Sequence, residues 1–501
     1  MPPALKRAQS PALPAAPRLA SAALQGRRPA LAAVAPAALR RTNTADRPRD
    51  PKPQAHANAT NVVSAVGTRV GNSEERTDMD AHSPWDSYPA TADIDLAALA
   101  ANAQRLRAYA PGARHMGIVK ADAYGHGRAQ VAKTLAQIGY DILGAAQLSE
   151  ALALRAELDH AGYSQVAIFS WMLPAGDVAT LRRALEAGIE VSVSSVGQLD
   201  MVRACELPAR IHLKVDTGMG RAGVPLAQLP QLAEQLRSAR DEDVRTVGVW
   251  SHLARADEVG PDAAAATRVQ RERFEQACAT LEACGLSGLT RHLAATSGVI
   301  WHPDTHYDMV RDGIGLYGLS PDPSHASSAE LGLQPVMTLR ANLNLVKQVP
   351  AGQTVSYGGT WTAEEDSWLG VVPLGYGDGI PRHASNCASV RVQGAVPIDT
   401  RIVGRVCMDQ FVVNLGAVGR ADFSGAGEVA PAEQTPAGQT PAGQMPPARA
   451  GDEVILFSNP QSSSTVGCPS ADDWAQASGT INYEIVTRIG ARVPRRYQPE
   501  V

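Results

Sequence analysis

The segment 116–127 combines a strand-like apolar run with a single lysine at its end. The run Met-Gly-Ile-Val leads to Lys120, and the turn Ala-Asp-Ala-Tyr-Gly-His-Gly follows before a helix-like stretch that begins at Arg128. Desolvation at the end of a buried strand lowers the pKa of a lysine and frees its amine as a nucleophile. The segment therefore predicts a lysine able to form a Schiff base. The run Gly-Ile-Val-Lys alone is explained more simply by a lysine that leaves a strand into solvent, and it is the turn after it that favours the Schiff-base lysine.

Polar or small residues also follow several later strand-like runs, where a barrel enzyme carries its functional groups. In chain order these residues are Lys214, Asp216, Arg221, His252, Thr296, Ser297, Gly298, Arg311 and Gly313. Each of them alone is explained by a helix cap, a turn or a solvated charge. Their convergence on the mouth of one barrel favours a binding site.

Two of these groups have the composition of a phosphate site. Small residues with backbone donors after late strands suit a phosphate. The residues of this kind are Ser297 with Gly298, and Gly313 with Ile314. The hydroxyl of Tyr124 adds a further donor, while ordinary turn glycines remain the alternative interpretation.

Strand-like and helix-like runs alternate from Thr91 to about Leu319. The predicted strands cover residues 116–120, 142–146, 165–170, 189–194, 210–215, 245–250, 291–295 and 308–311. The predicted helices cover residues 94–110, 129–138, 148–161, 177–187, 197–205, 226–238 and 267–284. About eight such repeats are typical of a TIM (β/α)8 barrel. A doubly wound open α/β sheet is the alternative, because the number of repeats does not establish closure.

A second pattern of short, β-branched runs separated by Gly and Pro begins after Ser320. The predicted strands cover residues 335–348, 355, 369–374, 388–392, 401–406, 411–415 and 453–456, with a short helix at 472–478 and a closing segment from Ile481. These runs predict a C-terminal all-β domain. The predicted division is a barrel at 86–325 and a β domain at 326–501. A low-complexity insertion at 425–450 carries a direct repeat of Thr-Pro-Ala-Gly-Gln.

Residues 1–85 are rich in Ala, Pro and Arg and sustain no period, so we expect a disordered extension. Every charged residue before Asp46, the first acidic residue, is basic, as in an organelle transit peptide. Residues 29–39, between two arginine pairs, faintly resemble an export signal but are interrupted by Pro36. An unstructured extension or upstream start codon, organelle targeting and export all stay open for this segment.

Composition argues against several functional classes. The net charge of -4 gives no basic surplus for binding nucleic acid and no acidic surplus for a solvating tail. The cysteines are Cys205, Cys278, Cys284, Cys387, Cys407 and Cys468. Since no CxxC pair occurs, they predict reduced thiols of a cytoplasmic enzyme instead of a disulfide framework or a metal site. No apolar run reaches the length of a membrane span.

A set of motifs resembles those of alanine racemases, which use pyridoxal 5'-phosphate. The motifs are Val-Lys-Ala-Asp-Ala-Tyr-Gly-His-Gly, Lys-Val-Asp-Thr-Gly-Met-Gly-Arg, Val-Ser-Tyr-Gly, Gly-Tyr-Gly-Asp-Gly and Gly-Arg-Val-Cys-Met-Asp-Gln. The resemblance covers about residues 88–420 and 451–497. It implies a barrel plus a β domain, a head-to-tail homodimer with shared active sites, and interconversion of L- and D-alanine that supplies D-alanine for peptidoglycan.

The resemblance also implies a role for each matching residue. Lys120 would carry the cofactor as a Schiff base and act as the base on one face of the substrate, with Tyr357 of the partner subunit as the base on the other face. Arg311 would contact the pyridine nitrogen. Arg221 would lie at the phenolate and the substrate, held by Lys214, which is often carbamylated in the family. The remaining implied contacts are His252 near the ring, Tyr124, Ser297, Gly313, Ile314 and Tyr483 at the phosphate, and, from the partner's β domain, Met408 and Tyr376 beside the substrate.

The physics agrees with these roles. Racemisation needs a base on each side of a planar carbanion, because a proton leaves one face and returns to the other. Lysine and tyrosine have reference pKa values near 10, so both must be perturbed to serve at neutral pH. Arg311 should keep the pyridine nitrogen unprotonated, since repulsion at roughly 4 Å and an effective dielectric of about 20 is about 4 kcal/mol, or about three pKa units. The weakened electron sink disfavours side reactions.

The chain departs from the family at Thr296, where Asn often precedes the phosphate serine, and at Ile380, where an aromatic residue commonly follows Gly-Asp-Gly. These departures concern pocket polarity and entrance shape. A broad-specificity or serine racemase is a close alternative, because a methyl group in a pocket is worth only about 1 kcal/mol or somewhat more. A basic amino-acid decarboxylase of the same fold type calls for an acidic partner of the ring nitrogen, so Arg311 argues against it. Tyr357 and the β domain argue against a non-catalytic cofactor-binding barrel.

Overall fold

The computed structural model describes residues 88–238, 243–419 and 445–498. The predicted disordered extension at 1–85 lies outside these ranges, as does most of the predicted insertion at 425–450. The six cysteines are free thiols. Within the described ranges, no helix combines the length and the apolar character that crossing a membrane requires.

Eight parallel strands form one sheet in the order β10-β2-β3-β4-β5-β6-β8-β9, and the short β7 pairs with β6. Their bounds are β2 (Arg114–Ile118), β3 (Ile142–Gln147), β4 (Ala167–Met172), β5 (Glu190–Val193), β6 (Ala209–Asp216), β7 (Val224–Pro225), β8 (Val244–Trp250), β9 (Thr290–His292) and β10 (Met309–Asp312). A parallel bridge between Ala295 and Arg311 joins the two ends of this order. The sheet is a nearly closed barrel, which confirms the predicted TIM barrel and rejects the open sheet.

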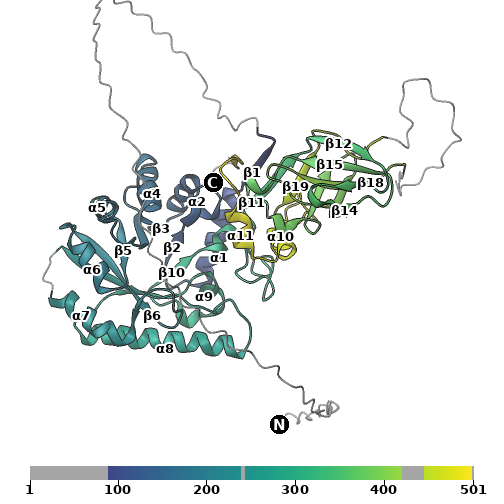
Figure 1. Ribbon diagram of the computed structural model, residues 1–501. Coiled ribbons are helices and arrows are strands. Elements are labelled where there is room, and N and C mark those ends of the chain that lie inside the picture. Colours follow the sequence, from purple (N-terminus) through teal and green to yellow (C-terminus); the bar gives the residue numbers. More distant parts are fainter. Residues whose placement is uncertain (1–87, 239–242, 420–444, 499–501) are drawn as a thin grey trace, which may run out of the picture. The chain divides into compact units, whose positions relative to one another are not determined.

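Helices follow the strands and cover the outside of the barrel (Figure 1). They are α1 (Leu96–Tyr109), α3 (Arg128–Gln137), α4 (Leu148–His160), α5 (Val178–Glu186), α6 (Val196–Arg203), α7 (Leu229–Ser238) and α8 (Pro261–Ala283). Several begin at side-chain caps: Asp95 Oδ1 accepts from Ala98 N at 2.9 Å, and Asp177 Oδ1 from Thr180 N at 3.1 Å. Helix α8 begins before the predicted start at Thr267, because an alanine-rich run with Pro261 in the first turn extends it.

Short helical elements lie in the connections between the barrel strands and the longer helices. They are α2 (Lys120–Tyr124), α9 (Thr296–Trp301), η1 (Leu226–Gln228), η2 (Pro303–Thr305) and η3 (Ile314–Tyr317). The strands β5 and β10 are buried at every position, as parallel strands covered by helices are. Three of these buried positions hold the charged residues Glu190, Arg311 and Asp312.

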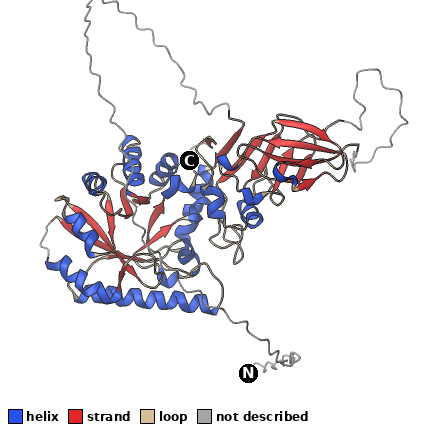
Figure 2. Ribbon diagram, viewed as in Figure 1, coloured by secondary structure: helices blue, strands red, loops and turns tan. Residues whose placement is uncertain are grey.

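The C-terminal part of the chain is built mainly of strands, drawn red in Figure 2, and confirms the predicted all-β domain. Its sheets have the orders β17-β16-β19-β11-β1-β20, β12-β15-β18 and β13-β14. The strands are β1 (Ala90–Ile94), β11 (Met337–Asn342), β12 (Leu345–Val349), β13 (Thr354–Val355), β14 (Trp361–Thr362), β15 (Ser367–Val372), β16 (Ser389–Gln393), β17 (Pro397–Arg401), β18 (Phe411–Ala417), β19 (Glu453–Phe457) and β20 (Arg495–Tyr497). The helical elements are η4 (Tyr357–Gly359), η5 (Tyr376–Asp378), η6 (Arg382–Ala384), α10 (Ala471–Ser478) and α11 (Asn482–Thr487).

Three details differ from the sequence predictions. Strand β1 precedes the barrel in the chain, yet it pairs with β11 and β20 of the C-terminal sheet, and the predicted domain boundaries do not account for this. The predicted strand 335–348 is two strands in separate sheets, β11 and β12. The predicted strand 401–406 is wrong. The strand there is β17, which ends at Arg401 and lies at the edge of its sheet. Its first residue, Pro397, has no backbone N–H to donate, which an edge strand tolerates.

Candidate active site

Lys120 follows the carboxyl end of β2, as predicted from the apolar run before it. Its Nζ lies 5.7 Å from the ring centre of Tyr124 and 5.8 Å from that of Trp171. Burial lowers the pKa of Lys120, and the positive charges of Arg221 and Arg311 lower it further. The environment therefore favours the neutral, nucleophilic amine.

The turn after Lys120 has a left-handed backbone. Residues 121–124 have φ values of 53° to 54°, although none of them is glycine. Such a conformation costs about 1–2 kcal/mol per residue, so it needs support from neighbouring groups. Glu150 Oε1 accepts from Ala121 N at 2.6 Å, and Asp122 Oδ1 accepts from Arg128 N at 2.8 Å. Glu150 thus holds the start of the lysine loop (residues 120–127), and Asp122 ties the loop to α3.

Arg311 lies in the barrel interior, on β10, and is only 4% exposed. Its Nη2 donates to the carbonyls of Ser251 and Leu293, both at 2.9 Å, and lies 3.1 Å from His252 Nδ1. Its Nη1 donates to the carbonyl of His292 at 3.0 Å. Burial lowers the pKa of Arg311 to about 9. These contacts are with carbonyls and imidazoles and contain no carboxylate, so the guanidinium keeps its positive charge unneutralised at the centre of the site.

The loop after β10 forms a small cradle. Thr296 Oγ1 accepts from Gly313 N at 3.0 Å. A Cβ atom added to Gly313 would lie 2.9 Å from the Tyr124 hydroxyl and 3.6 Å from Thr296 Oγ1. The ring of Tyr483, from α11, lies 6.3 Å from that of Tyr124. Hydroxyl groups and a backbone amide thus gather at one point, as a phosphate requires.

The hydroxyl that meets the Gly313 amide belongs to Thr296, and the predicted phosphate residue, Ser297, is the next residue along α9. In the sequence, Thr296 is one of the polar residues that follow the strand-like runs, and it is also a departure from the family. Ile314 follows Gly313 and is buried.

Lys214 and His252 lie beside Arg311. Lys214 Nζ lies 4.4 Å from the centre of a Trp250 ring, and burial together with Arg221 and Arg311 lowers the pKa of Lys214 to about 8. Burial, and next the charge of Arg311, hold the pKa of His252 well below its ordinary value, so His252 is neutral.

Arg221 is exposed and lies on the loop after β6. The carboxylate of Asp216 accepts from Gly218 N at 2.9 Å and from Gly220 N at 3.1 Å, which shapes that loop. Arg221 is therefore carried to the barrel mouth on a turn that its own motif, Asp-Thr-Gly-Met-Gly-Arg, stabilises.

Tyr357, Tyr376 and Met408 belong to a second group, on the C-terminal domain. They are 68%, 41% and 54% exposed. Tyr376 N donates to Cys407 O at 3.0 Å, and Ser356 Oγ donates to Arg405 O at 2.6 Å, so one set of loops carries all three. These hydrogen bonds stay within the C-terminal domain.

Glu150 is not among the site residues predicted from the sequence, although the sequence carries a signal for it. Glu150 Oε2 also accepts from Gln147 N at 3.1 Å, and the spacing Gln147-x-x-Glu150 is that of a capping box at the start of α4. The buried residues Glu190, His212 and His292 were missed as well. They come from three different strands, and nothing in the sequence pairs them.

Comparison with known proteins agrees with this geometry. Residues 94–321 match the family model described as alanine racemase, N-terminal domain, and residues 336–436 and 437–497 match alanine racemase, C-terminal domain. The alanine racemase of Streptomyces coelicolor is 44% identical over 417 residues, which is 82% of this chain and 96% of that protein. That of Mycobacterium avium is 39% identical over 414 residues, 82% of this chain and 95% of that protein.

Solved structures give the same result. The crystal structure of alanine racemase from D-cycloserine-producing Streptomyces lavendulae has a TM-score of 0.70 and 42% identity, and covers 82% of this chain and 98% of that chain. The biosynthetic alanine racemase from Pseudomonas aeruginosa has a TM-score of 0.66 and 31% identity, with coverages of 82% and 99%. The resemblance inferred from the motifs is confirmed: the chain belongs to the alanine racemase family of isomerases.

Proposed function

We propose that this chain interconverts L-alanine and D-alanine with Lys120 and Tyr357 as its two bases. The observation that carries the proposal is the amine of Lys120, whose pKa is lowered by burial and by two arginines at the mouth of the barrel. An amine in this environment can accept an α-proton near neutral pH. The product D-alanine would enter peptidoglycan, the usual role of the family.

Pyridoxal phosphate fits the residues present. A Cβ atom at Gly313 would occupy the space beside Tyr124 and Thr296, so the glycine keeps a cradle open for a phosphate. Tyr124, Ser297 or its neighbour Thr296, Gly313, Ile314 and Tyr483 would hold that phosphate. When bound, the cofactor supplies an aldehyde that condenses with an amine and a ring that withdraws electrons from the substrate α-carbon.

Arg311 would meet the pyridine nitrogen, and His252 would pack beside the ring. With a pKa of about 9, its guanidinium stays protonated at neutral pH and can only donate. A neighbouring positive charge disfavours protonation of the ring nitrogen. Arg311 therefore favours prompt return of the proton over side reactions, and it argues against the decarboxylase alternative.

Tyr357 would act from a second copy of the chain. A tyrosine that is 68% exposed, with Tyr376 and Met408 exposed beside it, is suited to enter the barrel mouth of another copy. We infer a homodimer with shared active sites, in which Tyr376 and Met408 line the substrate side. These side chains would then set the discrimination between alanine and serine.

Lys214 would become a carbamate. The residue is only 6% exposed, and its pKa of about 8 leaves part of the amine neutral at physiological pH. Attack of this amine on CO₂ forms an N–C bond and releases one proton. The new carboxylate would bind the guanidinium of Arg221 and hold it toward the phenolate of the cofactor and the substrate.

The test is formation of D-alanine from L-alanine by the purified protein with added pyridoxal phosphate, followed by chiral chromatography. Turnover to a one-to-one mixture supports the proposal. Cofactor-loaded protein that leaves L-alanine unchanged would refute it, and a panel with serine, lysine and arginine would then decide among the other racemases and the decarboxylases.

A further inference from the structure

A line of buried polar side chains crosses the barrel interior from Arg311 to the amino-terminal end of β5. Arg311 Nη1 lies 3.3 Å from His292 Nδ1, and His292 Nε2 lies 2.9 Å from His212 Nδ1. His212 Nε2 lies 2.7 Å from Glu190 Oε2. Arg210 Nε donates to the other oxygen of Glu190 at 2.6 Å. The side chains belong to β10, β9, β6 and β5, so the closure of the barrel brings them together.

The groups at the two ends of this line, Arg311 and Glu190, determine which ring nitrogen of each histidine carries a proton. A guanidinium only donates, so His292 Nδ1 must accept from Arg311 and the neutral ring carries its proton on Nε2. That Nε2–H donates to His212 Nδ1, and His212 in turn carries its proton on Nε2 and donates to Glu190. A carboxylate only accepts, which agrees with donation from both His212 and Arg210. Only one assignment of donors and acceptors satisfies all of these hydrogen bonds, and both imidazoles are neutral in it.

Burial and packing hold this arrangement. His292 is 0% exposed and Glu190 6%. Burial lowers the pKa of His292 well below its ordinary value. Burial alone would raise the pKa of Glu190, but the hydrogen bonds from His212 and Arg210, together with the charge of Arg210, bring it below its ordinary value. The His292 ring stacks on Trp250, with centres 5.7 Å apart and planes at 8°.

The neighbouring acid does not compete for Arg311. Asp312 follows Arg311 in β10 and so points to the opposite face of the strand, where it binds His115 Nδ1 at 2.7 Å and accepts from the Tyr140 hydroxyl at 2.8 Å. Arg311 is instead linked to the carboxylate of Glu190, through the imidazoles of His292 and His212.

We propose that Glu190 is a positioning residue for Arg311, acting through His212 and His292. Its carboxylate fixes the tautomers of both rings, so that His292 presents an acceptor to the guanidinium and holds it in one orientation. The reversed order would turn a His292 Nδ1–H toward the N–H of Arg311 and push the guanidinium away. The inference deepens the proposed function, because it rests on the role of Arg311 at the pyridine nitrogen.

The test is Glu190→Gln in the cofactor-loaded enzyme. An amide cannot serve both neighbours: if its oxygen faces His212, its NH₂ faces the donor of Arg210, and if its NH₂ faces His212, both tautomers reverse. We expect kcat to fall roughly tenfold or more, by analogy with the groups that orient metal-binding histidines. The KM for alanine should stay within about twofold, since Glu190 does not reach the substrate.

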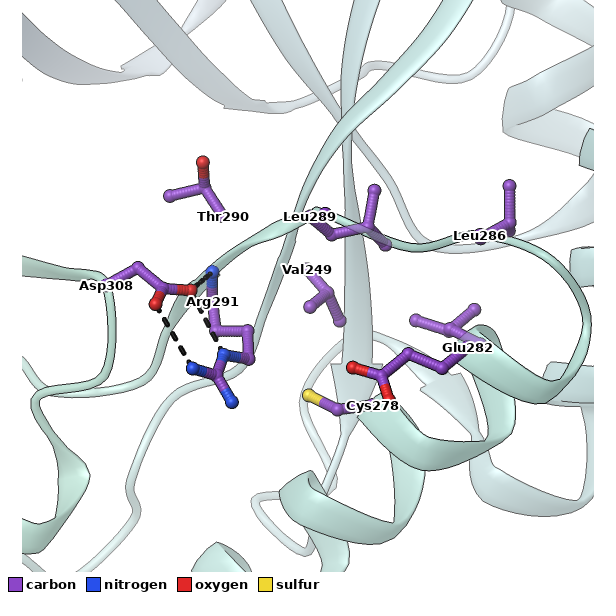
Figure 3. A pocket seen from close by; sticks show the side chains of 10 residues that line it. Val249, Cys278, Glu282, Leu286, Leu289, Thr290, Arg291 and Asp308 are labelled. Carbon is purple, nitrogen blue, oxygen red and sulfur yellow. Dashed lines mark hydrogen bonds and ion pairs between the residues drawn. The ribbon is translucent and has the colours of Figure 1, made fainter.

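Asp308→Asn is the matched control. Asp308 pairs with Arg291 at 3.0 and 3.1 Å at the same end of the barrel, beside the hollow lined by Val249, Cys278, Glu282, Leu286 and Leu289 (Figure 3). Like Glu190→Gln, this variant removes a carboxylate that is paired with an arginine. It leaves the line from Glu190 through His212 and His292 to Arg311 unchanged. Its kcat should equal that of the wild type.

Histidine ¹⁵N NMR of the wild-type, cofactor-loaded enzyme reads the tautomers directly and needs no variant to fold. We expect Nδ1 unprotonated and Nε2 protonated for both His292 and His212. A His292 protonated on Nδ1, or a Glu190→Gln enzyme with wild-type kcat, overturns the inference. An unchanged kcat in Arg311→Lys with the expected tautomers would instead overturn the proposed role of Arg311, so the two failures are distinguishable.

Discussion

The guanidinium of Arg495 donates from Nε to the carbonyl of Gly125 at 3.0 Å, linking β20 to the lysine loop across 370 positions of the chain. The same side chain donates to the carbonyls of Ile489, Gly490 and Val493 at 2.6 to 2.7 Å. One residue therefore fastens the C-terminal segment to the loop that follows Lys120.

Replacing Arg495 by Met should loosen this loop. The substitution leaves these backbone carbonyls without their charged donor. It should therefore lower the free energy of unfolding by about 2–3 kcal/mol, and kcat should fall as well. Thermal unfolding and D-alanine formation measure the two effects. Arg114→Met, which removes an exposed ion pair with Asp141, is the control and should cost at most about 1 kcal/mol. Equal losses in the two variants would contradict the fastening role.

Tyr357→Phe should abolish removal of the α-proton from one enantiomer, the L form by family analogy, and leave the cofactor bound. The phenol oxygen is the only group that the substitution removes, so the base on the other face stays intact. Deuterium wash-in from D₂O, followed separately for L- and D-alanine, measures the effect. Comparable wash-in from both enantiomers would refute the assignment of two bases.

Mixing Lys120→Ala protein with Tyr357→Phe protein tests whether the active sites are shared. If each site takes Lys120 from one chain and Tyr357 from the other, a heterodimer contains one site with both bases. Subunit exchange should therefore restore part of the activity. Heterodimers demonstrated by tagged purification but without recovery would show that each chain supplies both bases to its own site.

Gly313→Ala should weaken binding of pyridoxal phosphate about tenfold or more while the fold is retained. The added Cβ atom would lie 2.9 Å from the Tyr124 hydroxyl, in the proposed phosphate cradle, and a clash of this size costs about 1–3 kcal/mol. Titration of the cofactor by absorbance measures the change. Gly197→Ala is the matched control, because a Cβ atom on that glycine of α6 meets nothing within 4 Å, and its affinity should be that of the wild type.

Carbamylation of Lys214 should increase with pH. Only the neutral amine attacks CO₂, and with a pKa of about 8 the neutral fraction is about a tenth at pH 7 and about a half at pH 8. A carbamate signal in ¹³C NMR with labelled bicarbonate should grow over this range and vanish in Lys214→Met. Lys347→Met, on the exposed face of β12, should keep it. A signal independent of pH, or one that survives Lys214→Met, would contradict the prediction.

Much of the barrel follows from local sequence signals. The helix after Asp95 and the strand before Lys120 were predicted because caps and apolar periods act over a few residues. The edge strand β17 was missed because its side chains are partly or fully exposed and show no apolar period. The pairing of β1 with β20 and the contact between His212 and His292 depend on residues far apart in the chain, which no local pattern encodes.

The bond between Arg495 and Gly125 also has a consequence for biosynthesis. Gly125 is so close to α11 that a Cβ atom on it would lie 2.3 Å from the carbonyl oxygen of Val486, so the lysine loop reaches its final form only against α11 and β20. A ribosome that adds 5–20 residues per second needs about 20 to 75 s to travel the 370 positions between the two. A nascent chain therefore carries Lys120 for that time in a loop that still lacks these contacts.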